Sequence, residues 1–384
     1  MKREYPRTES RSRLGITIAM LLFSISAAFL AGCYGMRPSS GGGQTQFEPP
    51  RRVNPADVLL PAGYRIEVVT TGLTFPTGIT FDDRDTPYVV ESGYSYGEMW
   101  TTPRLLRLEP DGRVTVVATG GRNGPWTGVS FNEGAFFVAE GGVLEGGKIL
   151  KITPDGNVTV LVDGLPSYGD HHTDGPVVGK DGWIYFGQGT ASNSGVIGED
   201  NFKFGWLKRF PQFHDVPGED ITLTGENYAS KNPFSPHGQT TVETGAFVPF
   251  ATRTEPGQVI RGAVKCSGSV LRVRPQGGDL ELVAWGFRNP FGLAISPEGE
   301  LYVTDNSYDD RGSRPVWGTP DVLWKVEQGR WYGWPDFAAG EPLTEDQFKP
   351  PGKRKLKFVL ANHPNKPPKP VARFGVHASA DGLD

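Results

Sequence analysis

The sequence predicts an all-β fold, a β-propeller of four-stranded antiparallel blades, from a repeated hairpin, a second hairpin between its copies, and their spacing. Four stretches share one template, in which a small turn and a glycine precede two apolar runs separated by an acidic or glycine turn. They read PTGITFDDRDTPYVVESG from Pro76, WTGVSFNEGAFFVAEGG from Trp126, TDGPVVGKDGWIYFGQG from Thr173 and PFGLAISPEGELYVTDN from Pro290. The template glycines Gly78, Gly128 and Gly175 are 50 and 47 residues apart, and a propeller blade has roughly 40 to 50 residues.

Between the copies lies the second hairpin, in which period-two alternation is broken by a turn. It reads LLRLEPDGRVTVVATG from Leu105, ILKITPDGNVTVLVDG from Ile149 and VLRVRPQGGDLELVAWG from Val270. Such alternation around Asp-Gly turns is typical of antiparallel hairpins. One repeat unit therefore has four strands, as a blade does.

The two ends of the repeat region predict an open ring. Residues 63–72, GYRIEVVTTG, match the fourth-strand pattern but have no first three strands, and residues 379–384, SADGLD, open a fifth copy. In a closed propeller the N-terminal strand commonly completes the last blade. We therefore expect a ring incomplete at the C-terminus, which needs about one and a half to two further blades. A smaller ring with an irregular last blade is the alternative.

Two intervals are too long for bare blades, since Gly292 follows Gly175 by 117 residues and Gly382 follows Gly292 by 90. We expect one insertion at about 195–266, rich in aromatic residues and prolines, to pack over a face of the ring. The other, 348–374, has eight Lys or Arg, six Pro and no acidic residue. That composition favours a solvated, extended basic loop over a partner-binding patch.

The N-terminus predicts export and lipidation. Five basic residues among the first thirteen precede an uncharged stretch that ends in Leu-Ala-Gly-Cys at Cys33. This pattern predicts a lipoprotein signal peptide over 1–32, cleaved before a lipidated Cys33, with ordinary secretion as the alternative. Residues 33–56, rich in Gly and Pro, then form a tether, and 57–384 the propeller. We expect the protein outside the cytoplasm, lipid-anchored to a bacterial membrane.

Composition narrows the function classes. The chain of 384 residues has a formal net charge of −4, which disfavours nucleic-acid binding, since that needs a basic face. It has 2 cysteines. With Cys33 lipidated, Cys266 has no partner for an intrachain disulfide.

Chemistry-bearing residues gather at three loops that adjoin the repeat hairpins. The first is GDHHTDG, where His171 and His172 form a weak metal-site candidate because neighbours on an extended chain point to opposite sides. One histidine as general base fits better, and structural histidines are the alternative. The second is GFRNPFGL, with Arg288 and Asn289. The third is an acidic, turn-rich stretch from Asp305 through Asp321 to YGWP, which suits a hard cation such as calcium or is merely solvated.

Together, HHTDG, GFRNPFGLAISPEGELYVTD and YGWP resemble the glucose/sorbosone dehydrogenase family, six-bladed propellers related to soluble quinoprotein sugar dehydrogenases and aldose sugar dehydrogenases. The resemblance covers about 63–384. It implies calcium and pyrroloquinoline quinone (PQQ) at the central axis, and a histidine that takes the proton from a sugar hydroxyl while hydride passes to the quinone.

Carried over residue by residue, the resemblance makes His172 the base and Arg288–Asn289 the cofactor-contacting pair. His171 stands where the family has an aspartate, which leaves the sugar open. His171 and Gln188 are grouped with the cofactor-binding residues. The implied calcium residues are Ser307, Tyr308, Tyr332, Asp305 and Asp321, of which Ser307–Tyr308 replace a Gly-Pro pair that ligates through its carbonyls.

The resemblance thus implies a membrane-anchored quinoprotein that oxidises an aldose, a pyranose or a sugar aldehyde and passes electrons to a quinone or cytochrome. The family's basic clamp on the cofactor carboxylates lies in the last two blades, beyond Asp384, so the expected activity belongs to the complete ring. The alternative is a non-catalytic, NHL-like propeller that binds a ligand or a protein, because a fold alone does not specify a function.

Overall fold

The computed structural model describes residues 54–95, 99–236 and 240–384. The predicted signal peptide 1–32, the lipidation site Cys33 and all but the last three residues of the predicted tether lie outside this part. In the described residues no helix is long and apolar enough to cross a membrane. A 3₁₀ turn, η1 (Pro55–Asp57), precedes the first strand.

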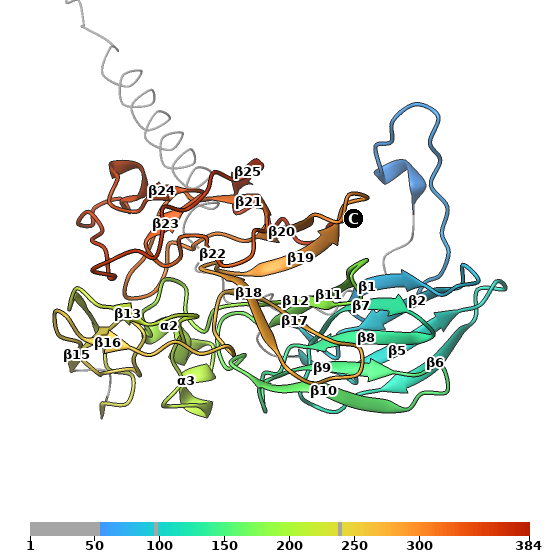
Figure 1. Cartoon of the computed structure of the whole chain (residues 1–384), viewed down its shortest axis with the longest axis horizontal. Helices are drawn as coiled ribbons and strands as arrows, with labels where there is room; N and C mark the ends of the chain where they lie inside the picture. The colour runs from blue at the N-terminus through green and yellow to red at the C-terminus, as the bar shows by residue number, and fades with distance from the viewer. Residues whose placement is uncertain (1–53, 96–98, 237–239) are drawn as a thin grey trace, which may run out of the picture. The chain divides into compact units, whose positions relative to one another are not determined.

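Four antiparallel sheets in the described residues make the chain a β-propeller (Figure 1), as the repeats predicted. Blade 1 is β1 (Pro76–Phe81), β2 (Pro87–Glu91), β5 (Arg104–Leu108) and β6 (Val114–Thr119). Blade 2 is β7 (Trp126–Asn132), β8 (Ala135–Glu140), β9 (Gly147–Ile152) and β10 (Val158–Leu165). Blade 3 is β11 (Thr173–Val178), β12 (Ile184–Gln188), β17 (Ser269–Val273) and β18 (Glu281–Trp285), extended by the parallel β22 (Arg330–Trp331). Blade 4 is β19 (Pro290–Ile295), β20 (Leu301–Asp305), β21 (Pro320–Lys325) and β25 (Ala372–Val376).

The template glycines let the innermost strands of successive blades approach closely. A Cβ on Gly128 of β7 would strike the carbonyl of Gly175 in β11, and a Cβ on Gly78 of β1 would lie only 3.1 Å from the Cα of Gly128. The Thr127 hydroxyl also bridges blades, since it donates to the Thr173 carbonyl at 2.8 Å. The repeated glycine therefore marks a close blade-to-blade contact that any side chain would block.

The chain ends behave differently from each other. Residues 64–70 form no strand, and Tyr64, Val68 and Val69 are exposed, as expected for a fourth strand without its blade. The fifth template copy does contact blade 4: a Cβ on Gly292 of β19 would strike the Asp381 carbonyl, which accepts from the Thr304 hydroxyl at 2.8 Å. Residues 380–381 thus lie beside β19 as Gly175 lies beside β7.

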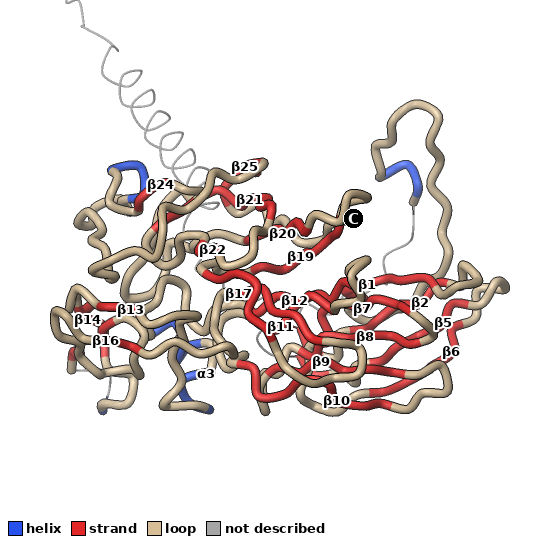
Figure 2. Tube along the Cα trace, in the orientation of Figure 1, coloured by secondary structure: helices blue, strands red, loops and turns tan. Residues whose placement is uncertain are grey.

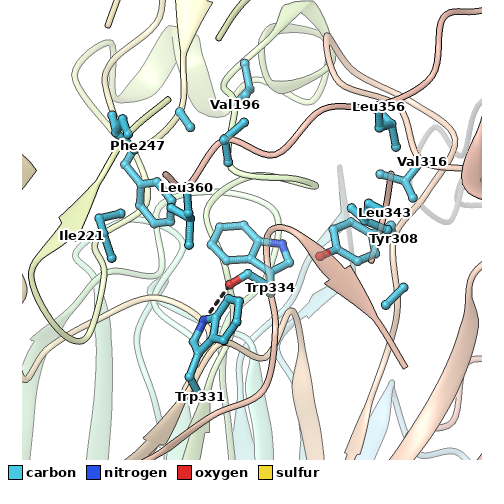
Figure 3. Close-up of a cluster of buried hydrophobic side chains, with 14 of the residues drawn as sticks. Val196, Ile221, Phe247, Tyr308, Val316, Trp331, Trp334, Leu343, Leu356 and Leu360 are labelled. Carbon is cyan, nitrogen blue, oxygen red and sulfur yellow. Dashed lines mark hydrogen bonds between the residues drawn. The ribbon is translucent and has the colours of Figure 1, made fainter. Parts of the chain in front are cut away.

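The first insertion folds into short elements joined by loops (Figure 2). They are α2 (Glu199–Lys203), α3 (Trp206–Arg209), β13 (Ile221–Thr222), β14 (Asn227–Lys231), β15 (Thr241–Gly245) and β16 (Val259–Ile260). Its apolar side chains share one core with residues 308–360, as Figure 3 shows for Val196, Phe247, Trp331 and Trp334. The Trp331 indole donates to the Trp334 carbonyl at 3.1 Å within this core. Burial of aromatic area explains why a segment with so little regular structure is ordered.

The second insertion is more ordered than its composition suggested. It comes directly after the small hairpin β23–β24 (Phe337–Ala338 with Glu341–Pro342) and the turn η3 (Asp346–Phe348). A similar small hairpin, β3–β4 (Tyr94–Ser95 with Met99–Trp100), forms a sheet of its own between β2 and β5. Leu356, Val359 and Leu360 are buried, and the last residues form β25. A buried carboxylate, Asp336, accepts the Val359 and Leu360 N–H groups and so fixes the loop. The lysine side chains of this loop are exposed, as predicted for a solvated basic loop, while Leu356, Val359 and Leu360 pack into the core.

Candidate functional site

The structure brings the three predicted loops together at one end of blades 3 and 4. His171–His172 directly precede β11, Arg288–Asn289 directly precede β19, and residues 305–309 begin at the last residue of β20. Residues 189–190 connect the first two loops: the His171 N–H donates to the Thr190 carbonyl at 2.9 Å, and the Thr190 N–H donates to the Arg288 carbonyl at 2.9 Å. Three loop segments that are far apart in the sequence thus become neighbours at one site.

His171 is held in one tautomer. Its Nδ1 lies 3.2 Å from the Thr190 carbonyl and 3.1 Å from the Thr190 hydroxyl oxygen. That hydroxyl donates its proton to the Ser192 carbonyl at 2.7 Å, so Nδ1 is the donor and Nε2 is left as acceptor. Burial, reinforced by Arg288, lowers the pKa of His171 to about 3. The imidazole is therefore neutral at physiological pH.

His172 is also buried and neutral. Its side chain is 8% exposed, and its carbonyl accepts the Gly189 N–H at 2.8 Å. Burial lowers the pKa of His172 to about 4, against a smaller opposing effect of Asp170. A neutral imidazole is the protonation state that a general base requires.

Arg288 is a buried cation that contacts four residues on three surrounding segments. Its Nε and Nη2 donate to the Asn193 side-chain oxygen at 3.2 and 3.0 Å, and Nη1 donates to the Asn306 carbonyl at 3.2 Å. Nη2 also pairs with Asp309 at 2.8 Å and lies 3.8 Å from Asp170. These contacts fix the guanidinium and leave one N–H of Nη1 without a partner among the described residues.

Asp305 sets the backbone of the Arg288–Asn289 pair. One carboxylate oxygen accepts the N–H groups of Arg288 at 3.1 Å and Asn289 at 2.8 Å, and the other accepts the Trp324 indole N–H at 3.2 Å. Burial raises the pKa of Asp305 to about 6, opposed in part by these hydrogen bonds. Asn289 donates to the Asn306 side chain at 2.8 Å, while its own side-chain oxygen is buried without a hydrogen-bond partner in the described residues.

Gln188 lies beside the site but serves the loops. Its side-chain oxygen accepts the Thr173 hydroxyl at 2.7 Å and the Ser167 hydroxyl at 3.1 Å, and its amide donates to the Gly189 carbonyl at 2.9 Å. With both ends of a fully buried amide engaged, Gln188 stabilises the His171–His172 loop. These bonds use the side-chain oxygen and one of the two amide N–H groups, and the contact of Gln188 with a cofactor stays a prediction.

The predicted calcium residues share a pocket but do not form a carboxylate cage. Four of them, with Arg288, line a small pocket with a cavity volume of about 20 Å³, to which Asp321 does not contribute. The four are Asp305, Ser307, Tyr308 and Tyr332. Among the described residues no group of three His, Cys, Asp or Glu is placed to hold a metal ion.

Several of the predicted calcium residues already make hydrogen bonds within the chain. Asp321 accepts the Ser307 N–H at 2.9 Å and the Ala380 N–H at 3.3 Å. The Tyr308 carbonyl accepts the Thr319 hydroxyl at 2.9 Å, and the Tyr332 hydroxyl donates to the Lys325 carbonyl at 2.7 Å. The side chains therefore do not fit a calcium ion in this arrangement, and calcium stays a prediction that rests on main-chain oxygens.

Sequence reasoning did not assign the charged network around Arg311. Arg311 pairs with Asp170, with Asp200 at 2.8 Å and with Asp309 at 2.9 Å. Although burial alone raises it, the pKa of Asp170 is held well below its usual value by Arg311, His171 and Arg288. The position of Asp170 directly before His171–His172 was a sequence signal for the part that Asp170 plays in this network. No sequence signal joins Arg311 to Asp200 of the insertion.

A second residue missed by the sequence is Asp174 on β11. Its side chain is 1% exposed, and one carboxyl oxygen is buried without a hydrogen-bond partner in the described residues. Burial, with Asp381 adding to it, raises the pKa of Asp174 well above its usual value. Burial therefore favours the neutral form of this carboxyl.

Comparisons with known proteins found solved structures with a likeness to this chain. No family model matches it, and no curated protein matches it. Three solved structures illustrate the likeness. The PQQ-bound aldose sugar dehydrogenase of Streptomyces coelicolor is 16% identical, with 83% of this chain and 73% of that chain covered and a TM-score of 0.46. A putative oxidoreductase (glucose dehydrogenase) of Thermus thermophilus is 18% identical, with 76% of this chain and 75% of that chain covered and a TM-score of 0.44. The pyranose dehydrogenase PQQ domain of Coprinopsis cinerea is 14% identical, with 70% of this chain and 56% of that chain covered and a TM-score of 0.40.

Solved structures of other kinds of protein also match, among them a virginiamycin B lyase, a gluconolactonase and a nidogen in complex with laminin. Identities below 20% and TM-scores below 0.5 assign no activity to this chain. Its function has to follow from its own residues.

Proposed function

We propose that this chain is a PQQ-dependent sugar dehydrogenase that oxidises a CH–OH group of an aldose or pyranose. The observation that supports the proposal is the meeting of His171–His172 with Arg288–Asn289 across residues 189–190. It combines neutral, buried imidazoles with a fixed guanidinium, the groups needed to take a hydroxyl proton and to stabilise negative charge on an oxygen.

The pair Arg288–Asn289 fits a planar, polar cofactor. The unpartnered Asn289 oxygen is an acceptor and the remaining N–H of Arg288 is a donor, so a bound group with both functions would satisfy them. When bound, PQQ would supply the electron acceptor for removal of hydride from the sugar carbon. Arg288, Asn289 and His171 would hold it, and Gln188 would support their loops.

In this proposal His172 is the general base. Neutral His172 accepts the proton of the sugar hydroxyl. The ionised carboxylate of Asp170, two residues before His172 in the sequence, favours the positive charge that His172 then gains. Arg288 is held by Asp309, by Asp170 and by the Asn306 carbonyl. No step is assigned to calcium, since the side chains of Asp305 and Asp321 are occupied by N–H donors.

A non-catalytic binding module is the second candidate. The observation that favours it is the low exposure of Arg288, 4%, with most of its donors committed within the chain. Such a residue could be purely structural. The position of the histidines and Arg288 before the inner strands β11 and β19, at the same end of both blades, favours the enzyme.

The test is quinone-dependent reduction of an artificial electron acceptor by the purified protein with a complete ring, in the presence of calcium and an aldose. His172→Ala should lower turnover about 100-fold or more while quinone affinity changes little, because a general base contributes roughly 10² to 10⁴-fold. His214→Gln, outside the site, is the matched control. Quinone binding with an unchanged rate in His172→Ala would remove His172 from the mechanism, and no quinone binding by the wild-type protein with a complete ring would favour the binding module.

The wider setting is also part of the proposal. A lipidated Cys33 would keep the propeller at the outer side of a bacterial membrane, where a membrane quinone or a cytochrome would receive the electrons. Nucleic acid is not an expected partner of a chain with net charge −4.

A further inference from the structure

The most densely charged buried cluster of the site is built on two arginines that share their carboxylates. Arg288 and Arg311 both contact the same oxygen of Asp309, at 2.8 and 2.9 Å. Both also face the same oxygen of Asp170, which pairs with Arg311 and lies 3.8 Å from Arg288. Arg311 has a third carboxylate, Asp200 of α2, at 2.8 Å. Arg311 therefore stands between the insertion and the site.

The surroundings of Arg311 keep it in place. Its side chain is 11% exposed, and the guanidinium lies over the Phe204 ring at 5.2 Å from the centroid. The Asn193 amide donates to the carbonyls of Asp309 and Arg311 at 2.8 and 3.2 Å, while its oxygen accepts from Arg288. One asparagine thus binds the main chain of one arginine and the side chain of the other.

Charge balance explains what Arg311 does for Arg288. With both arginines present, two cations face the three carboxylates Asp170, Asp200 and Asp309, and Arg288 keeps its shortest contact with Asp309. Without Arg311, Asp170, a fully buried carboxylate, still has the Arg288 guanidinium 3.8 Å away among the described residues. A buried charge that loses one of its partners draws a neighbouring opposite charge closer or takes up a proton. Arg288 would then turn from Asn193 towards Asp170.

We infer that Arg311 is a positioning residue. By pairing with Asp170 it leaves Arg288 directed at the quinone site, and by pairing with Asp200 it makes the position of Arg288 depend on the insertion. The inference rests on the proposed function only for the identity of the group that Arg288 contacts. The position of Arg288 itself is a property of the chain without any cofactor.

The first experiment measures Arg288 in the purified chain without quinone. Its Nε–H, which donates to Asn193, should give a slowly exchanging side-chain signal in a ¹⁵N NMR spectrum, assigned with Arg288→Lys. In Arg311→Gln we expect that signal to shift and to exchange faster. In the double variant Asp170→Asn/Arg311→Gln, which removes the carboxylate that attracts Arg288, the signal should return towards its wild-type position. Arg253→Gln, which breaks an exposed ion pair of the insertion, should leave it unchanged.

Arg311→Lys provides a second variant if the glutamine variant unfolds. Lysine keeps the charge but cannot reach three carboxylates at once, so an intermediate shift is expected. An Arg288 signal unchanged in position and exchange in a folded Arg311 variant, or a double variant no closer to wild type than Arg311→Gln, would overturn the inference.

Quinone titration of the same variants separates this inference from the proposed function. We expect affinity to fall about 10-fold or more in Arg311→Gln, the usual cost of disturbing a buried charged contact, and to recover in part in the double variant. If Arg288 moves as expected while the wild-type chain binds no quinone, the positioning role stands and the proposed function fails. If the wild-type chain binds quinone and Arg311→Gln binds it equally well with Arg288 unmoved, the positioning role fails.

Discussion

Replacing Asp305 tests whether one buried carboxylate sets the Arg288–Asn289 backbone. In Asp305→Ala, three buried donors lose their acceptor: the Arg288 and Asn289 N–H groups and the Trp324 indole. Each unsatisfied donor costs about 1 to 3 kcal/mol. Part of this cost is offset, because the wild-type carboxylate is itself penalised when ionised.

The size of that offset follows from the pKa of Asp305, which burial raises to about 6. A folded-state pKa about two units above the unfolded value near 3.9 means that ionisation costs the folded state roughly 3 kcal/mol. The sign is that of a raised acid pKa: this contribution destabilises the protein as pH rises through about 4 to 6, and it is absent below about pH 4. The net effect of Asp305→Ala at neutral pH is therefore a loss of about 3 kcal/mol, from roughly 6 lost and roughly 3 regained.

Thermal unfolding measures this loss. For about 330 ordered residues the entropy of unfolding near the midpoint is roughly 0.7 kcal/mol/K, so the Tm should fall by about 4 °C. Asp305→Asn keeps an acceptor and removes the charge, so its Tm should stay within about 2 °C of wild type at neutral pH and should lack the downward trend between about pH 4 and 6. Asp279→Asn, on the surface, is the control. A wild-type Tm for Asp305→Ala would refute this account of the carboxylate.

Three further predictions concern other parts of the chain. Since the pKa of His172 is lowered to about 4 by burial, kcat/KM should be level from about pH 8 to about pH 5 and fall only as pH approaches 4, and a midpoint near 6.5 would contradict the buried base. Arg314, fully buried, donates to Asp336 at 2.9 Å and to the carbonyls of Ser194, Pro335 and Lys357; Arg314→Met should cost about 3 to 5 kcal/mol in unfolding experiments, whereas Arg253→Met, at an exposed pair, should cost at most about 1. Radioactive fatty acid should label the protein in bacterial cells and should fail to label Cys33→Ala, so persistent labelling of that variant would exclude Cys33 as the lipidated residue.

The sequence by itself determined the blades and the places of the loops that meet at the site. Alternating residues and Asp-Gly turns are local signals, so β5–β6, β9–β10 and β17–β18 fall where the second hairpin pattern lies. The template glycine is readable for the same reason, because a close approach of two strands excludes every other residue. The candidate residues His172, Arg288 and Asn289 were named from motifs at these positions.

Only the tertiary structure decided which charges meet. Arg311 joins Asp170, before β11, to Asp200 in the insertion, and the period of a strand or the composition of a loop carries no information about partners so distant in sequence. The same holds for Asp305: its sequence context, an acidic turn-rich stretch, suggested a cation, while its three N–H donors come from β21 and from the loop before β19. Pairing in a buried cluster is set by the packing of blades and insertion, because desolvated charges must be matched by whatever the fold places beside them.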